Sequence, residues 1–261
     1  MRVFTLLLGL LLLTACGDSK KYDSALDRVL ENKVLIVGTE PEFKPFESKD
    51  ADGNFVGFDM DMIRLLAEDL GVELRIEEMG FTTLVPALQT HKIDMIISGM
   101  TATKKRSKKV TFSDTYYDTP ICLLVHKDSG INKPEDADGK RLVVKQGTTG
   151  ADHAREQFPK SADKTTKMQA EGECAAEVAL GRADAFVYDM LSVLGAQKKH
   201  ADTTRAIIKP PVAIEGYAMA MRHGDTKMVQ RVNEFLAKIR ADGRFKKLQD
   251  KYLRELLDAA K

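Results

Sequence analysis

Residues 92–96 read Lys-Ile-Asp-Met-Ile, and residues 182–186 repeat this pattern as Arg-Ala-Asp-Ala-Phe. In each copy a helix-like pattern ends, a basic residue follows, and a strand with one internal aspartate begins. The apolar runs at 34–38 and 141–145 open the two halves, and such runs are typical of strands buried on both faces of a sheet. The sequence therefore predicts a similar α/β unit built twice.

Strands and helices alternate within both halves. After the turn at 50–54, for example, Phe58, Met62 and Leu66 recur at helical spacing until Gly71 ends the helix. This alternation predicts βαβ units, and hence mostly parallel sheets flanked by helices. The predicted strands are 34–38, 72–77, 93–97, 141–145, 165–169 and 183–188, and the helices between them are 58–70, 83–90, 151–157 and 171–180.

The chain has two further apolar strands, at 121–125 and 217–221, and two closing helices, at 227–241 and 244–257. If the closing helices pack on the first unit, the chain must cross between the units twice, near 116–120 and near 211–217. We therefore expect one lobe from residues 33–117 and 216–261 and a second lobe from residues 118–215.

The N-terminus is typical of a secreted protein, because Arg2 is followed by an apolar run too short to span a bilayer. Residues 13–16, Leu-Thr-Ala-Cys, resemble a bacterial lipobox, so we expect a signal peptide at 1–15, lipidation of Cys16 and a tether at 16–32. An ordinary signal peptide with a chance cysteine is the alternative. The expected location is extracytoplasmic, with the lipid as the only membrane anchor.

Composition excludes several classes of function. Once Arg2 is removed, the Lys and Arg residues equal the 39 Asp and Glu residues in number, which gives no support for nucleic-acid binding. The five histidines are scattered, so the sequence predicts no metal site and no catalytic cluster. Cys122 and Cys174 could form a disulfide outside the cytoplasm, but their apolar surroundings favour free buried thiols.

Residues 98–106, Ser-Gly-Met-Thr-Ala-Thr-Lys-Lys-Arg, follow a predicted strand and lead into a helix expected to begin near Lys104. The carboxyl ends of strands are where open α/β sheets bind ligands, and a helix N-terminus favours an anion. Gly99 permits close approach of the backbone, Thr101 supplies a hydroxyl, and Arg106 fits a carboxylate through two parallel hydrogen bonds. We expect the four lysines at 104, 105, 108 and 109 to face solvent.

The second half offers a matching turn at 146–150, Gln-Gly-Thr-Thr-Gly, where Thr149 could complete an anion site across a cleft. Asp189 also stands between a strand and a helix. It could simply cap the helix that follows, or it could accept a hydrogen bond from an ammonium group. An anion site that faces an ammonium site describes an α-amino acid as the ligand.

Residues 57–62, Gly-Phe-Asp-Met-Asp-Met, continued by Leu66, Ala67 and Leu70, resemble the signature of the family 3 extracellular solute-binding proteins. The resemblance runs from about residue 34 to residue 253. It implies the type II periplasmic-binding-protein fold, in which two α/β lobes joined by two hinge strands close around one polar amino acid. It also implies delivery of that free L-amino acid to the permease of an ABC importer by a monomer without a cofactor.

The resemblance also implies roles for individual residues. The ligand carboxylate would be held by Arg106, Thr101 and Thr149, the ligand ammonium group by Asp189 and the backbone of Gly99, and the ligand side chain by Phe43 and Phe81. Asp59 and Asp61 of the signature are expected to stabilise the start of their helix rather than to touch the ligand.

Glu40 and Lys145 are the residues expected to select the ligand side chain. The family places an acid at the position of Glu40, whereas Lys145 would repel a cationic side chain. An acid and a base together suit an amide, which both donates and accepts, so glutamine leads, and arginine, lysine and histidine follow. Alternatively, Lys145 pairs with Glu40 and leaves the pocket effectively neutral.

Two alternative functions remain at this point. The enzyme cyclohexadienyl dehydratase resembles the family closely, but its proton-donating glutamate is matched here by the stretch that ends in Ser192, so the sequence predicts no enzyme. A sensor that reports an amino acid to another protein would use the same closed state as a transport receptor.

Overall fold

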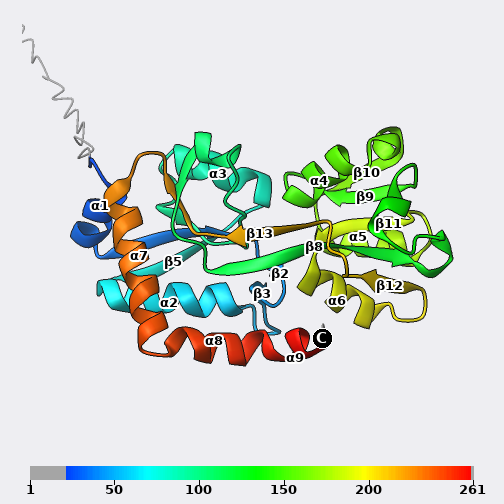
Figure 1. Ribbon diagram of the computed structural model, residues 1–261. Coiled ribbons are helices and arrows are strands. Elements are labelled where there is room, and N and C mark those ends of the chain that lie inside the picture. Colours follow the sequence, from blue (N-terminus) through cyan, green and yellow to red (C-terminus); the bar gives the residue numbers. More distant parts are fainter. Residues whose placement is uncertain (1–21, 260–261) are drawn as a thin grey trace, which may run out of the picture.

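The computed structural model describes residues 22–259 and shows two α/β lobes joined by two long strands (Figure 1). In lobe 1 the strands follow the order β5-β1-β6-β14-β7, with β1 parallel to β5 and β6, and β14 antiparallel to its neighbours. These strands are β1 (Val34–Thr39), β5 (Glu73–Glu78), β6 (Met95–Ile96), β7 (Val110–Phe112) and β14 (Ala220–Arg222). The predicted α/β fold is confirmed, but this sheet is mixed rather than mostly parallel, because β14 runs antiparallel to both β6 and β7.

Lobe 2 contains the order β10-β9-β11-β8-β12, with β13 also paired to β8. Strands β10, β9 and β11 are parallel, and β8 runs antiparallel to β11, β12 and β13. Their bounds are β8 (Tyr117–His126), β9 (Leu142–Lys145), β10 (Thr165–Met168), β11 (Ala185–Asp189), β12 (Thr204–Ile207) and β13 (Ala213–Tyr217). The paired strands β8 and β13 cross between the lobes and form the hinge (Figure 1).

The helices bury one apolar face each against these sheets. In α2 (Phe58–Leu70), for instance, Met62, Ile63 and Leu66 are fully buried, and Gly71 ends the helix in the left-handed conformation. The other helices are α1 (Ala25–Asn32), α3 (Phe81–Gln89), α4 (Thr149–Gln157), α5 (Glu171–Ala179), α6 (Met190–Lys199), α7 (Thr226–Ala241), α8 (Arg244–Tyr252) and α9 (Arg254–Ala259). Short elements complete the fold: β2 (Glu42–Phe43), β3 (Glu47–Lys49), β4 (Phe55–Val56), and the 3-10 turns η1 (Arg106–Lys108), η2 (Lys127–Ser129), η3 (Pro134–Ala137) and η4 (Pro159–Lys164).

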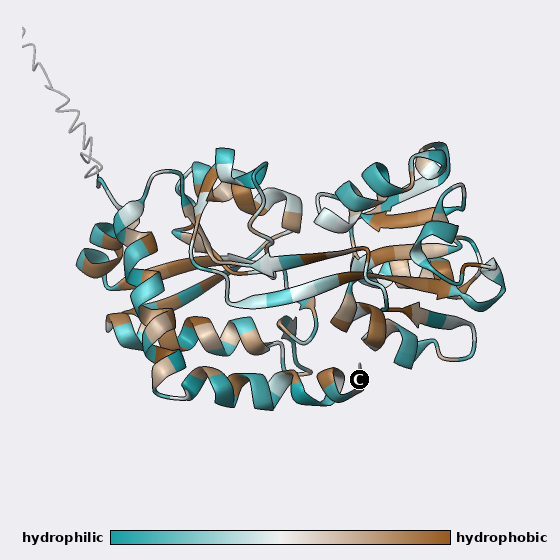
Figure 2. Cartoon of the chain, in the orientation of Figure 1, coloured by the Kyte–Doolittle hydropathy of each residue, from teal (hydrophilic) through white to brown (hydrophobic). Residues whose placement is uncertain are grey.

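The central strands of each lobe are apolar, and the outward faces of the helices that cover them are hydrophilic (Figure 2). Cys122 and Cys174 are both buried and free, which confirms the expected free thiols. Burial raises the pKa of each thiol to about 12. Among the described residues, no helix has the length and apolar character that crossing a bilayer requires.

Both ends of the described chain are tied to the body of the protein. Helix α1 begins inside the predicted tether, and the Ser24 hydroxyl donates to Asp225 (2.6 Å), next to α7. At the other end α7 and α8 cover lobe 1, whereas α9 reaches α6 of lobe 2, where Lys198 and Glu255 lie 3.0 Å apart (Figure 1). The predicted signal peptide and Cys16 lie outside the described residues.

The prediction of a helix that begins near Lys104 is wrong. The chain forms only the 3-10 turn η1 before β7 begins at Val110. Like charges three and four residues apart, as among the lysines of this segment, disfavour a helix. The four lysines are exposed, as predicted, and only Arg106 is partly buried. Arg106 therefore acts from a turn, without the dipole of a long helix.

Candidate functional site

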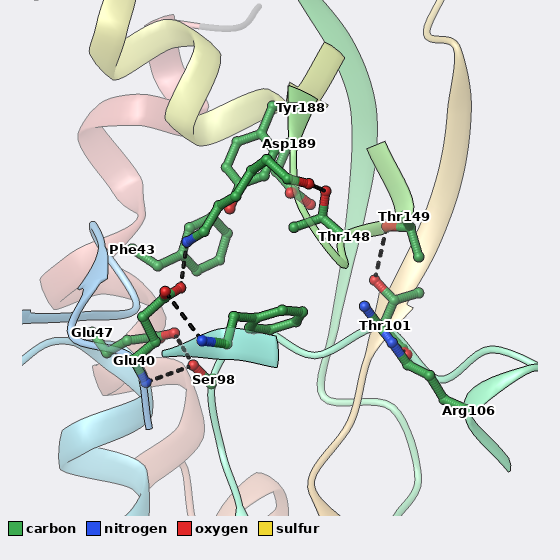
Figure 3. A pocket seen from close by; sticks show the side chains of 13 residues that line it. Glu40, Phe43, Glu47, Ser98, Thr101, Arg106, Thr148, Thr149, Tyr188 and Asp189 are labelled. Carbon is green, nitrogen blue, oxygen red and sulfur yellow. Dashed lines mark hydrogen bonds and ion pairs between the residues drawn. The ribbon is translucent and has the colours of Figure 1, made fainter. Parts of the chain in front are cut away.

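A cavity lies between the lobes at the carboxyl ends of β1, β6, β9 and β11, which is the edge where open α/β sheets bind ligands. Sequence segments far apart contribute to it, and all nine residues predicted to contact a ligand line it (Figure 3). The lining residues are Glu40, Phe43, Glu47, Phe81, Ser98, Gly99, Thr101, Arg106, Lys145, Thr148, Thr149, Tyr188 and Asp189.

Arg106 is fixed between the two lobes. One terminal nitrogen donates to the carbonyl of Thr101 in lobe 1 (2.9 Å), and the other donates to the carbonyl of Gly147 in lobe 2 (3.0 Å). Its guanidinium also lies 5.3 Å from the centre of the Phe81 ring, within the range of a cation–π contact. Burial lowers the pKa of Arg106, but nearby carboxylates, Glu215 first among them, favour its charged form. Three of its five N–H donors remain for an anion.

Two threonines flank this guanidinium. The hydroxyl oxygens of Thr101 and Thr149 lie 3.4 Å apart, across the boundary between the lobes. Thr149 opens helix α4, whose N-cap is Thr148. We call the part of the cavity lined by Arg106, Thr101 and Thr149 the arginine end (Figure 3).

Asp189 is buried at the last position of β11. Its carboxylate accepts a hydrogen bond from the hydroxyl of Tyr217 on the hinge strand β13. Asp189 stands at the N-cap position of helix α6, but its side chain makes no capping hydrogen bond. Burial raises the pKa of Asp189 to about 7, even though the Tyr217 hydrogen bond and Arg106 favour the ionised form. A cation placed in the cavity would restore its negative charge, so Asp189 is suited to bind an ammonium group.

Glu40 and Lys145 contact each other directly at the opposite end of the cavity, which we call the lysine end. Lys145 is 1% exposed, so this is a pair of desolvated charges from different lobes. The other carboxylate oxygen of Glu40 accepts from the backbone N–H of Phe81 (3.2 Å) at the start of α3. Of the alternatives drawn from the sequence, the structure has the one in which Lys145 pairs with Glu40.

The cavity is tight around this pair. The centres of water molecules can occupy only about 20 Å³ of it, which is room for one or two waters. A larger molecule could therefore enter only if the lobes separate or if the contact between Glu40 and Lys145 opens.

Gly99 and Phe43 form one wall. Gly99 has a positive φ of +49°, and a Cβ atom there would lie 2.3 Å from the Phe43 ring, so no other residue fits. Phe43 makes edge contacts with Tyr188 (5.8 Å between ring centres) and Tyr217 (6.0 Å). The glycine was predicted for close approach to a ligand, and it also permits close approach of an aromatic side chain.

Asp59 lies in the first turn of α2, as expected, but its carboxylate hydrogen-bonds to groups outside that helix. Its carboxylate accepts from the backbone N–H of Gly99 (3.1 Å) and the Tyr116 hydroxyl (2.8 Å), so it holds the wall of the cavity. Burial raises the pKa of Asp59 to about 6, and burial beside Asp59 raises the pKa of Glu47, which accepts from Ser98 (2.9 Å). Asp61 instead binds Lys251 (2.7 Å) of the C-terminal helices.

Sequence reasoning missed several residues around the cavity. Ser98, Thr148 and Tyr188 adjoin predicted residues in the chain, so neighbourhood alone could have indicated them. Glu215 and His153, which bind each other behind the arginine end, come from distant segments without a local signal. Glu171, at the start of α5, is also new.

Glu171 faces the lobe boundary beside Ser192, in a second cavity that also contains Glu42 of lobe 1. One of its carboxylate oxygens is buried without a hydrogen-bond partner. Burial raises the pKa of Glu171 to about 8, against the effect of Lys145, which favours its ionised form. Glu171 is thus a buried carboxyl group close to the lysine end, and burial favours its protonated form. Within residues 22–259, no group of His, Cys, Asp and Glu side chains could hold a metal ion.

Comparison with known proteins gives consistent matches. Residues 35–255 match the family described as bacterial extracellular solute-binding proteins, family 3. The arginine-binding extracellular protein ArtP of Bacillus subtilis is 33% identical over 241 residues, which cover 92% of each chain. The histidine-binding periplasmic protein of Escherichia coli K12 is 31% identical and covers 84% of this chain and 86% of its own.

Solved structures agree with the sequence matches. An ancestral arginine-binding protein has been solved with arginine and with glutamine bound. The arginine complex has a TM-score of 0.78 at 34% identity and the glutamine complex a TM-score of 0.77 at 33% identity. Each alignment covers 85% of this chain and 98% of the ancestral one.

Proposed function

The chain belongs to the family 3 bacterial extracellular solute-binding proteins, and we propose that it is an extracytoplasmic receptor for a polar amino acid, with glutamine favoured. On this proposal the lobes close around a free L-amino acid and present it to the permease of an ABC importer. The related proteins are binding proteins rather than enzymes, so a dehydratase activity has no support.

The separation of charge across the cavity is the observation that carries the proposal. Arg106 and Thr149 offer donors for a carboxylate, and Thr101 lies between them. Asp189 offers a buried acceptor whose ionised form an ammonium group would stabilise, and the carbonyl of Gly99 would be a second acceptor. The α-carboxylate and α-ammonium groups of an amino acid match these two partners.

The pair of Glu40 and Lys145 supports the choice of glutamine. An amide that enters between them could donate to the Glu40 carboxylate and accept from the Lys145 ammonium group, so both buried charges would stay hydrogen-bonded. A cationic side chain would satisfy Glu40 but would leave Lys145 beside a like charge. The proposed order of affinity is therefore glutamine first and then arginine, lysine and histidine, with Phe43 and Phe81 packed on the aliphatic part.

Calorimetric titration of the purified protein with the twenty common amino acids tests this function. We expect micromolar or tighter binding of glutamine and weaker binding of the three cationic amino acids. Failure of all four to bind would refute the proposed specificity, failure of all twenty would refute an amino-acid receptor, and preference for arginine would refute only the role given to Lys145. Incubation with prephenate or arogenate should give no product, and turnover of either would show an enzyme instead.

We also propose that the protein is a monomer anchored through a lipid on Cys16 after removal of residues 1–15. Cells grown with labelled palmitate should incorporate the label into the wild-type protein and not into the Cys16→Ser variant. Labelling of the variant would rule out this anchor. Loss of amino-acid uptake on deletion of the gene would favour a transport receptor over a sensor.

A further inference from the structure

The carboxylate of Glu215 joins both lobes from the hinge. Glu215 lies on β13, and its Oε2 accepts from the hydroxyl of Thr101 in lobe 1 (2.9 Å). Its Oε1 lies 2.7 Å from Nε2 of His153, on helix α4 of lobe 2. The side chains of Glu215 and His153 are only 10% and 22% exposed, so solvent screens this contact incompletely.

The Glu215 carboxylate fixes the direction of the hydrogen bond that the Thr101 hydroxyl makes. A threonine hydroxyl has a single proton, and an ionised carboxylate can only accept hydrogen bonds. Because the Thr101 proton is directed at Glu215, the Thr101 oxygen presents lone pairs to its other neighbours. Towards Thr149 (3.4 Å), the Thr101 oxygen can therefore only accept, and the single Thr149 proton can go instead to Glu215 or to a ligand.

We propose that Glu215 and His153 are positioning residues that orient the Thr101 hydroxyl as an acceptor for the ligand ammonium group and hold lobe 2 against lobe 1. This inference rests on the proposed amino-acid receptor, and it revises the predicted role of Thr101, whose hydroxyl was assigned to the ligand carboxylate. Arg106 and Thr149 remain as the donors for that carboxylate.

His153 completes the arrangement because it keeps the charge on Glu215. Burial alone would raise the pKa of Glu215, but hydrogen bonds from His153, Thr149 and Thr101 outweigh burial and lower it. In turn, the hydrogen bond to Glu215 raises the pKa of His153. Other charged groups also face the pair of Glu215 and His153, which we call the Glu215–His153 couple. They are Asp152 and Glu156 of α4, Arg106 of η1 and Asp189 of β11. Asp152 is itself paired with Lys105 and Arg155.

The Glu215–His153 couple should make closure of the two lobes depend on pH. A raised pKa of His153 in the closed state means that the contact stabilises closure fully below the ordinary pKa of histidine and ceases to do so as the pH rises through the raised value. The contribution of His153 to ligand affinity should therefore shrink between about pH 6 and pH 8. Asp189 acts in the opposite direction, so only the difference between wild type and a His153 variant isolates this effect.

The test compares wild type with His153→Gln and Glu215→Gln, by calorimetry with glutamine and arginine at pH 6, 7 and 8. His126→Gln is the matched control, because His126 is 20% exposed and 3.9 Å from Asp128 in lobe 2, away from the boundary. We expect His153→Gln to lose up to about fivefold in affinity at pH 6 and less at pH 8. The control should follow the wild type at every pH.

A double-mutant cycle distinguishes a positioning role of Glu215 from a general structural effect. Thr101→Val should weaken binding, and the combination with Glu215→Gln should cost clearly less than the sum of the two single changes, because both act through one hydroxyl. Additive losses would overturn the role given to Thr101. If ligand affinity depends on pH equally in wild type and in His153→Gln, the role proposed for His153 is wrong.

An NMR titration of the histidine rings gives a readout that does not need ligand binding. Recorded with and without amino acid, the titration midpoint of His153 should fall in Glu215→Gln relative to wild type. An unchanged His153 midpoint overturns the proposal even if amino acids bind. Conversely, a lowered midpoint in a protein that binds no amino acid would support the contact and reject the receptor function.

Discussion

At the arginine end of the cavity the cation is held by backbone carbonyls, whereas at the lysine end it is held by a carboxylate. Arg106 donates to the carbonyls of Thr101 and Gly147, so its positive charge is not cancelled and remains available to an anion. Lys145 and Glu40 cancel each other, and a ligand must intervene between them. The first arrangement suits a group that every amino acid carries, and the second suits a side chain that differs between ligands.

The largest effect expected from this difference is at the arginine end. Arg106→Ala should cost about 3–5 kcal/mol of binding free energy, because it removes the buried cation that faces the ligand carboxylate. The loss should be similar for glutamine and arginine, as calorimetry of both can establish. Lys108→Ala is the control, because Lys108 is exposed on the same segment, and its removal should leave affinity unchanged. A loss of affinity for only one of the two ligands would contradict the assignment of the arginine end to the carboxylate that every amino acid carries.

Asp189→Asn should follow, with a loss of about 2–4 kcal/mol for all ligands. Burial holds the pKa of Asp189 near 7 in the closed cavity, and the ligand ammonium group requires the ionised form. A bound ammonium group favours the ionised carboxylate, so wild-type affinity should decrease as the pH falls into the range where Asp189 takes up a proton, whereas the variant lacks this contribution. Titrations at several pH values measure both slopes, and equal slopes would exclude Asp189 from the site.

The lysine end should respond with a change in selectivity. Lys145→Met removes the charge, shortens the side chain by one atom and leaves Glu40 free for a cationic ligand. We expect arginine to gain about 1–2 kcal/mol relative to glutamine. Competition between labelled glutamine and unlabelled arginine gives this ratio directly. If the ratio does not move, Lys145 does not read the ligand side chain.

Glu171→Gln should have the smallest effect, and mainly at alkaline pH. Because burial raises the pKa of Glu171 to about 8, closure takes up a proton there, and wild-type closure weakens as the pH rises above the ordinary value of a glutamate. The variant has no such proton and should bind more tightly than wild type at pH 8.5, by on the order of 1 kcal/mol. Equal affinities at that pH would show that Glu171 does not titrate on closure.

Local signals in the sequence were sufficient for much of the fold and for the position of the site. Apolar runs marked the strands, and Gly99, Arg106 and Asp189 could be located because each lies in the segment that follows such a run. The helix predicted near Lys104 failed because like charges and the approaching strand β7 outweigh a local turn signal.

Tertiary contacts account for what the sequence could not predict. Asp59 begins a helix in sequence but binds Gly99, 40 positions away, and Glu215 meets His153 across 62 positions. No spacing rule links such pairs, because the hinge and the packing of the lobes bring them together. The contact between Glu40 and Lys145, 105 positions apart, was considered because the resemblance to the family places both residues beside the ligand side chain.

The two buried thiols also make the protein convenient for spectroscopy. With pKa values near 12, Cys122 and Cys174 hold almost no thiolate at neutral pH, and thiolate is the form that reacts with maleimides. In a chain without Cys16, cysteines introduced at 198 and 255 would be the reactive positions, and these sites face each other across the lobes, 3.0 Å apart as an ion pair. A pair of fluorophores there would turn ligand-driven closure into an optical signal without prior removal of native cysteines from the folded body.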